Sequence, residues 1–258
     1  MVAISTLSDV LGRMRPMEPA VPADRFGAIA ISPDERWFEF GLPGRRQVIG
    51  FHDYARIYAE PGLYERVFIQ ELGMRSTFEV VRLFGGALAR LGLDPSAQRV
   101  LDVGAGNGIG GEALRALGIG SVLAVDVEPV ARVAAERDRP GVYEDFVVAD
   151  LSTDAERFAG SELTAVVALS AIGPGHVPPD ALRRVLGLLE PGGLYAFAVM
   201  PALLPGSADE VGRSTGYPAY LAELLASSKE LDRAAYVHRR QADGSPHEAV
   251  ALVGRIDG

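Results

Sequence analysis

The glycine-rich stretch at residues 99–112 limits the fold of this chain more than any other feature. It reads Arg-Val-Leu-Asp-Val-Gly-Ala-Gly-Asn-Gly-Ile-Gly-Gly-Glu. Val100, Leu101 and Val103 form a short apolar run, interrupted only by Asp102, that is typical of a buried parallel strand. Ala113, Leu114 and Leu117 then follow at helical spacing. A strand that enters a helix through a glycine loop is the phosphate- or nucleotide-binding turn of α/β folds, so the stretch predicts a nucleotide-cofactor site.

Two classes of cofactor are compatible with this turn. Gly106-x-Gly108-x-x-Gly111, with Asp126 about 20 residues further on, satisfies the dinucleotide fingerprint. Asp102, however, stands directly before the glycines, where its carboxylate would repel a pyrophosphate. The same carboxylate would attract the ammonium and sulfonium groups of S-adenosylmethionine. Charge therefore favours S-adenosylmethionine, and an NAD-dependent oxidoreductase remains the alternative.

Two segments carry a resemblance to a known family. Residues 101–108 resemble motif I of the class I S-adenosylmethionine-dependent methyltransferases, and 189–197, Leu-Glu-Pro-Gly-Gly-Leu-Tyr-Ala-Phe, resemble the family's later Pro-Gly-Gly turn. The resemblance runs from residue 54 to the C-terminus. Within the family, residues 140–143, 149–151 and 175–178 are similar to the small methyltransferase-like group that includes the Williams–Beuren region protein.

This resemblance implies an α/β fold, namely a Rossmann-like, seven-stranded, mostly parallel sheet with a C-terminal antiparallel hairpin and an N-terminal cap. Residues 1–50 are expected to form an N-terminal arm, or a hairpin extension in which 25–31 pair with 36–40. The methyltransferase domain is expected over 51–258. Its expected parts are cap helices at 52–91, a cofactor core at 97–200, a substrate wall at 201–231 and a terminal hairpin at 232–258.

One cap helix has a clear apolar stripe that predicts how it packs. The stripe consists of residues at spacings of three and four, namely Phe78, Val81, Phe84, Leu88 and Leu91. Such a stripe predicts an amphipathic helix whose apolar side lies against the sheet.

The resemblance also implies roles for cofactor-binding residues. Asp102 would bind the ammonium, and Gly104, Gly106 and Gly108 would allow the backbone to approach the cofactor closely. Asp126 ends an apolar strand and offers two carboxylate oxygens to the ribose hydroxyls, although it could instead cap the next helix. The remaining implied contacts are Asp150 to adenine, Leu151 beside the ring, and Val127 and Ser170.

The methionine end of the cofactor needs partners from the cap. Tyr54, Tyr58 and Arg75 are the candidates that the resemblance suggests. The alternative is that both tyrosines only anchor their helix and that Arg75 lies on a solvated face.

The loop after the predicted fourth strand, at 170–176, bears on the chemistry. It has neither the Asn/Asp-Pro-Pro-aromatic sequence of nucleic-acid amino methylases nor the metal-ligating Asp of catechol-type enzymes. We therefore predict no metal and no nucleic-acid substrate. His176 is its titratable group with a reference pKa near neutrality, so His176 is the candidate catalytic proton acceptor. The alternative is a loop histidine that holds its own turn.

Composition narrows the substrate and the location. The net charge is −9, which disfavours a polyanionic partner and favours a small-molecule substrate. No apolar run approaches the roughly 18 residues that a membrane span needs, and the first residues lack a signal-peptide pattern, so we expect a cytoplasmic protein without membrane contact. Met200, Tyr217 and Tyr220 are the candidates for an apolar substrate wall, although such residues belong more often to a core. The expected reaction is methyl transfer, with cofactor binding without transfer as the alternative.

Overall fold

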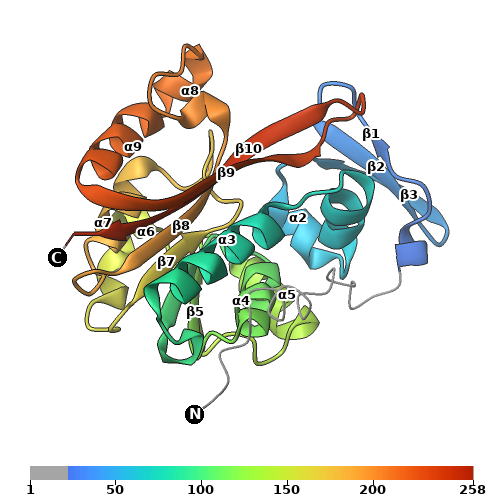
Figure 1. The fold of residues 1–258 in the computed structure, drawn as a ribbon. Coiled ribbons are helices and arrows are strands. Elements are labelled where there is room, and N and C mark those ends of the chain that lie inside the picture. Colours follow the sequence, from blue (N-terminus) through green and yellow to red (C-terminus); the bar gives the residue numbers. More distant parts are fainter. Residues whose placement is uncertain (1–22, 258) are drawn as a thin grey trace.

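The computed structural model describes residues 23–257, and their main feature is a seven-stranded sheet (Figure 1). Its strand order is β6-β5-β4-β7-β8-β10-β9. The first five of these strands are parallel, and β10 is antiparallel to both β8 and β9. The strands are β4 (Arg99–Val103), β5 (Ser121–Asp126), β6 (Asp145–Val148), β7 (Ala165–Ala168), β8 (Leu194–Val199), β9 (Ser228–Arg240) and β10 (Pro246–Ile256). The predicted fold class is confirmed.

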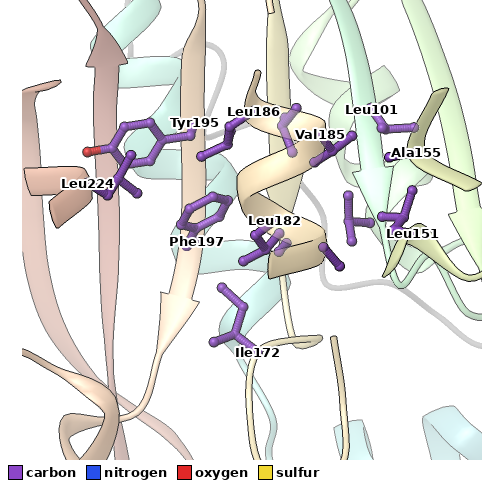
Figure 2. Packing of buried hydrophobic residues seen from close by; sticks show 14 of the residues in the cluster. Leu101, Leu151, Ala155, Ile172, Leu182, Val185, Leu186, Tyr195, Phe197 and Leu224 are labelled. Atoms are coloured by element: carbon purple, nitrogen blue, oxygen red, sulfur yellow. The ribbon is translucent and has the colours of Figure 1, made fainter. Parts of the chain in front are cut away.

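Helices cover both faces of this sheet because successive strand residues point to opposite sides. One face of the sheet packs under α6 (Leu151–Asp154), α7 (Pro179–Leu186) and α9 (Tyr217–Ala226). Figure 2 shows this packing, with Leu182, Val185 and Leu186 of α7 between Tyr195 and Phe197 on one side and Leu101 and Leu151 on the other. The opposite face packs under α3 (Ser76–Leu91) and α4 (Ile109–Leu117).

The predicted stripe of α3 lies where the sequence places it. Val81, Phe84 and Leu88 are fully buried against the sheet, and Phe78 and Leu91 pack at the edge of the same cluster. The helix ends at Gly92, which takes the left-handed conformation common at helix C-termini. The prediction that this helix covers the sheet is confirmed.

A second, three-stranded antiparallel sheet precedes the cap. It consists of β1 (Ala30–Ile31), β2 (Trp37–Leu42) and β3 (Arg45–Gly50), in that order. Ile31 pairs with Phe38, so the expected pairing across 32–35 is present, but its first strand has only two residues. The third strand was not predicted. Phe38, Phe40 and Ile49 bury the inner face of this sheet against α2 (Tyr54–Ala59), the π-helical turn η2 (Glu65–Glu71) and α5 (Pro129–Asp138).

The long β9–β10 hairpin links the two sheets (Figure 1). Arg239 of β9 donates from both terminal nitrogens to Glu35 in the β1–β2 turn, at 2.8 and 2.6 Å. The amide of Arg240 also donates to the carbonyl of Leu72, at 2.7 Å, and the amide of Arg75 donates to the carbonyl of His238, at 2.8 Å. The hairpin therefore holds the small sheet and the cap in place above the carboxyl ends of the parallel strands.

Candidate functional site

Two adjoining cavities lie at the carboxyl ends of β4, β5 and β7. The larger has a volume of about 580 Å³ and the smaller about 30 Å³. Gly104, Ser170, Tyr58 and Tyr64 line both. The position is the one at which open α/β sheets bind ligands, because the glycine loop and the neighbouring strand ends leave a crevice there. The two cavities therefore adjoin at these four residues.

Asp102 lies in the wall of the small cavity, 2% exposed, near the end of β4. Its Oδ2 accepts a hydrogen bond from the hydroxyl of Tyr143 at 2.8 Å. Burial raises the pKa of Asp102 to about 7, a shift that the Tyr143 hydrogen bond opposes and the charge of Asp126 reinforces. A cation bound in the small cavity would stabilise the ionised form of this carboxylate.

Asp126 ends β5 and lies in the wall of the large cavity. Its Oδ2 accepts the amide of Gly106 at 2.8 Å, and its Oδ1 accepts the amide of Glu128 at 2.9 Å. Burial raises its pKa, although these amides act in the opposite direction. Glu128, not Asp126, is the N-cap of α5. Asp126 is thus at the cavity in the position predicted for a ribose contact.

The glycines of the loop differ in position. Gly106 has φ +54°, and a Cβ on it would lie 2.5 Å from the hydroxyl of Tyr58, so a side chain would displace that tyrosine from the cavity wall. Gly104 also lines both cavities. Gly108 lines neither, because it is the N-cap of α4 and faces Arg139 instead. The close approach of Gly108 to a cofactor stays a prediction.

The carboxyl end of β6 lies on the other side of the large cavity. The predicted cofactor contacts Asp150, Leu151, Val127 and Ser170 all line this cavity. Asp150 is not the last residue of the strand: it is the N-cap of α6, and its Oδ1 accepts the amide of Ser152 at 2.8 Å. This bond lowers the pKa of Asp150. Asp150 therefore lines the large cavity and caps α6 with the same side chain.

The cap supplies three tyrosines but no arginine to the cavity walls. Tyr58, which is buried, and Tyr64, which is partly buried, line both cavities, and Tyr54 lines the large one. Arg75 is exposed, pairs with Glu79 at 2.8 Å, and lines neither cavity. The structure therefore corrects the prediction for Arg75, which lies on the solvated face. Thr77, two residues later in α3, lines the small cavity instead.

His176 lies at the mouth of the large cavity beside two residues from the cap. Its Nδ1 is 3.0 Å from the carbonyl oxygen of Pro174, so Nδ1 carries the proton and Nε2 is left with a lone pair. Nε2 is 3.3 Å from the hydroxyl of Tyr54, which is 3.4 Å from Nδ1 of His52. Burial raises the pKa of Tyr54 to about 12, so its phenol stays protonated. We call His52, Tyr54 and His176 the mouth cluster.

The expected substrate wall does not reach the cavities. Tyr217 and Tyr220 are buried in the core under α9, and Met200 packs at its edge. None of the three lines either cavity. The hydroxyl of Tyr217 instead donates to the carbonyl of Val177, so it supports the His176 loop from behind. The mouth cluster and residues 174–178 line the large cavity.

Two polar features beneath the glycine loop were not predicted. One is Tyr143, whose hydroxyl donates to Asp102. The other is a buried ion-pair network in which Arg139 donates to Glu65 at 2.8 Å, to Glu112 at 2.7 Å and to the carbonyl of Asn107 at 3.1 Å. No local periodicity indicates these contacts, since the partners are far apart in the chain. Nothing in the sequence around Arg139, which directly precedes Pro140, indicated that its side chain would be buried.

The charges of the cavity walls are of one sign. Asp102, Asp126, Glu128 and Asp150 contribute carboxylates, and among residues 23–257 no Arg or Lys lines either cavity. Phosphate-bearing ligands are normally held by arginine, lysine or free helix-end amides, and the amide of Gly106 is already bonded to Asp126. In the same part of the chain, no set of three or more His, Asp or Glu side chains converges as metal ligands would, and no helix is long and apolar enough to cross a membrane.

Comparisons with known proteins agree with this geometry. Residues 101–197 match the family model described as a methyltransferase domain. Ribosomal protein L11 methyltransferase of Symbiobacterium thermophilum is 38% identical over 99 residues, which are 38% of this chain. The chain thus spans 30% of the length of that curated relative.

Two solved structures share the fold over most of the chain. N-methyltransferase NodS from Bradyrhizobium japonicum, in complex with S-adenosylhomocysteine, is 18% identical, with a TM-score of 0.54 over 80% of this chain and 97% of that one. The plantazolicin methyltransferase BpumL, also in complex with S-adenosylhomocysteine, is 11% identical, with a TM-score of 0.51 over 80% of this chain and 94% of that one. Residues 101–197 therefore resemble a methyltransferase domain, and the seven-stranded sheet has the fold of these two solved structures.

Proposed function

We propose that this chain transfers the methyl group of S-adenosylmethionine to a small-molecule acceptor held in the large cavity. The observation that carries the proposal is the charge of the cavity walls, which present four carboxylates and, among residues 23–257, no Arg or Lys. A cofactor with an ammonium and a sulfonium but no phosphate suits such walls, whereas a dinucleotide does not. The solved structures of similar fold hold S-adenosylhomocysteine.

The two cavities divide the cofactor between them. Asp102 in the small cavity would hold the ammonium, and Asp126 and Asp150 in the large cavity would hold ribose and adenine. Leu151 and Val127 offer apolar contact to the adenine ring. Tyr58 and Tyr64 line both cavities and would cover the methionine chain from the cap side. This assignment uses every acidic residue of the walls except Glu128.

The acceptor would lie beside the mouth cluster. A volume of about 580 Å³ falls within the range of small-molecule sites and must also accommodate the adenosine half of the cofactor. The Tyr54 hydroxyl is 3.3 Å from Nε2 of His176, so these two groups contact each other. An acceptor with a hydroxyl or amino group would take the place of this contact, giving its proton to Nε2 and accepting a hydrogen bond from the Tyr54 hydroxyl.

When bound, S-adenosylmethionine supplies an activated methyl group on a sulfonium. The chain aligns the nucleophile, excludes water and receives the proton that the nucleophile loses. The donor is already activated, so alignment provides most of the rate enhancement. His176 would receive the proton at Nε2, while the Pro174 carbonyl holds the opposite nitrogen and keeps the ring orientation.

Transfer from methyl-labelled S-adenosylmethionine to a fractionated extract of the source cells tests the proposal. We expect the label in the fraction below about 1 kDa, because the acceptor end of the cavity is small. Label recovered only in protein or RNA would contradict the small-molecule assignment. No enzyme-dependent label in any fraction, with S-adenosylhomocysteine bound normally, would favour cofactor binding without transfer.

His176→Gln then tests the proton acceptor. We expect the turnover number to fall by about 10²- to 10⁴-fold, the usual contribution of a positioned acid–base group, while the Kd for S-adenosylhomocysteine stays within about twofold. His247→Gln is the matched control, because His247 lies on β10 and lines neither cavity. Equal turnover in the His176 variant and the wild type would rule out the catalytic role of His176.

A further inference from the structure

Tyr143 contacts the carboxylate that the proposed function assigns to the cofactor ammonium. It lies in the loop between α5 and β6, outside the motif I segment. Its hydroxyl donates to Asp102 Oδ2 at 2.8 Å and accepts the amide of Gly111 at 3.1 Å. The amide uses the hydroxyl oxygen as its acceptor, so the hydroxyl proton is left to point at Asp102. The bond therefore has a fixed direction.

Two glycines at the start of α4 make room for this pair. A Cβ on Gly110 would lie 2.3 Å from Asp102 Oδ2, and a Cβ on Gly111 would lie 2.4 Å from the Tyr143 ring. Gly111 is the third glycine of the apparent dinucleotide fingerprint. Here the space it leaves is occupied by a tyrosine side chain, so the fingerprint has a cause other than pyrophosphate binding.

The second oxygen of Asp102 is left for a ligand. Within residues 23–257 no protein donor reaches Oδ1, and Asp102 lines the small cavity. Burial and the neighbouring carboxylate raise the pKa of Tyr143, so this residue remains a phenol and a donor. Phe146 packs edge-on against its ring, with the ring centroids 5.6 Å apart, and limits its movement.

We infer that Tyr143 is a positioning residue for the cofactor's amino-acid end: it holds Asp102 by Oδ2, directs Oδ1 into the small cavity, and thereby selects ligands that carry an ammonium group. This inference rests on the proposed S-adenosylmethionine binding. It adds a determinant of ligand choice that lies outside the glycine loop.

Calorimetric titration of Tyr143→Phe with two ligands tests the inference. S-adenosylhomocysteine carries the amino-acid end, whereas 5′-methylthioadenosine has the same adenosine thioether without it. We expect the variant to bind S-adenosylhomocysteine on the order of tenfold more weakly than the wild type, the effect of one lost hydrogen bond to a charged group. Its affinity for 5′-methylthioadenosine should stay within twofold. Tyr236→Phe is the matched control, because it loses a partly buried hydroxyl bonded to Ser76, away from both cavities.

Gly111→Ala provides a second route to the same result. Its methyl group must displace the Tyr143 ring, so we expect the same selective loss of S-adenosylhomocysteine affinity while the fold is kept. Unchanged S-adenosylhomocysteine affinity in Tyr143→Phe, or an equal loss for both ligands, would overturn the inference and leave the proposed function intact. Equal affinity of the wild type for S-adenosylhomocysteine and 5′-methylthioadenosine would also overturn the inference. A wild type that binds neither ligand would overturn both proposals.

Discussion

The guanidinium of Arg139 lies 2.8 Å from Oε1 of Glu65, and both side chains are almost fully buried. Glu65 belongs to η2 of the cap, and Arg139 is the C-cap of α5. Asn107 of the glycine loop also donates to Glu65, at 2.9 Å. The Arg139–Glu65 ion pair thus connects the cap, the glycine loop and α5 directly beneath the cofactor site.

Arg139→Ala should therefore reduce stability strongly. Removing one partner leaves the Glu65 carboxylate buried and uncompensated, so we expect the free energy of unfolding to fall by about 3 to 5 kcal/mol in urea denaturation. Arg132→Ala is the matched control from the same helix, because its pair with Glu136 is exposed. That variant should change stability by less than about 1 kcal/mol. Equal effects of the two substitutions would contradict the buried-network account.

Cofactor affinity should rise with pH across neutrality. Burial raises the pKa of Asp102 from 3.8 to about 7 in the empty site, so the carboxylate is largely protonated below pH 7. A bound ammonium favours the ionised form, so binding releases a proton in this range. The association constant for S-adenosylhomocysteine should therefore increase by up to about tenfold per pH unit below pH 7 and level off above it.

The control ligand for this profile is 5′-methylthioadenosine. It reaches the ribose and adenine residues but not Asp102, so its profile reports any contribution from Asp126, whose pKa is also raised. The difference between the two profiles isolates Asp102 and should vanish in Asp102→Asn. Identical profiles for both ligands in the wild type would mean that Asp102 does not face the ammonium.

The Glu35–Arg239 pair should hold the three-stranded sheet against the β9–β10 hairpin. Both side chains are mostly buried, and Glu35 Oε1 also accepts the amide of Ala242 at 2.9 Å. We expect Glu35→Gln to increase amide hydrogen exchange in β2 and β3, because the sheet loses its charged anchor. Glu39→Gln is the control, since its partner Arg46 is highly exposed. Equal protection of β2 and β3 in both variants would show that the apolar inner face alone holds the sheet.

The cofactor half of the fold was predictable because its signals are local. The run at 100–103, the glycines after it and the spacing of Ala113, Leu114 and Leu117 all occur within 20 residues. The parallel pairing of β4 and β5 then brought Asp102 and Asp126 to the same edge of the sheet. A parallel sheet places the ends of its strands together, so the carboxylates of the site followed from strand order.

Contacts between distant residues were not predictable. Tyr143 and Asp102 are 41 positions apart, and Arg139 and Glu65 are 74 apart, so no periodicity relates them. Arg75 seemed suitable for the site by position, but its backbone caps α3 and its side chain turns outward to Glu79. The aromatic residues Tyr217 and Tyr220 were candidates for a substrate wall, although such residues belong more often to a core, and they lie in the core.

The third strand of the small sheet did have a local signal. Leu42 pairs with Arg45 across Pro43-Gly44, and Gly44 has φ +77°. Proline followed by glycine is the signature of a type II turn, so this dipeptide indicated a second hairpin directly after the first. The strand itself buries only Ile49 fully, which left its apolar pattern too weak to recognise.

The central claim is that the acidic cavities bind S-adenosylmethionine through Asp102. A thermal-shift titration with S-adenosylhomocysteine and NAD, on the wild type and on Asp102→Ala, tests it most directly. At about 100 times its Kd a ligand adds about 2.7 kcal/mol, which for a chain of this size raises Tm by roughly 5 to 10 °C. We predict this shift for S-adenosylhomocysteine with the wild type, little or no shift with Asp102→Ala, and none for NAD with either protein. Stabilisation of the wild type by NAD alone would contradict the account.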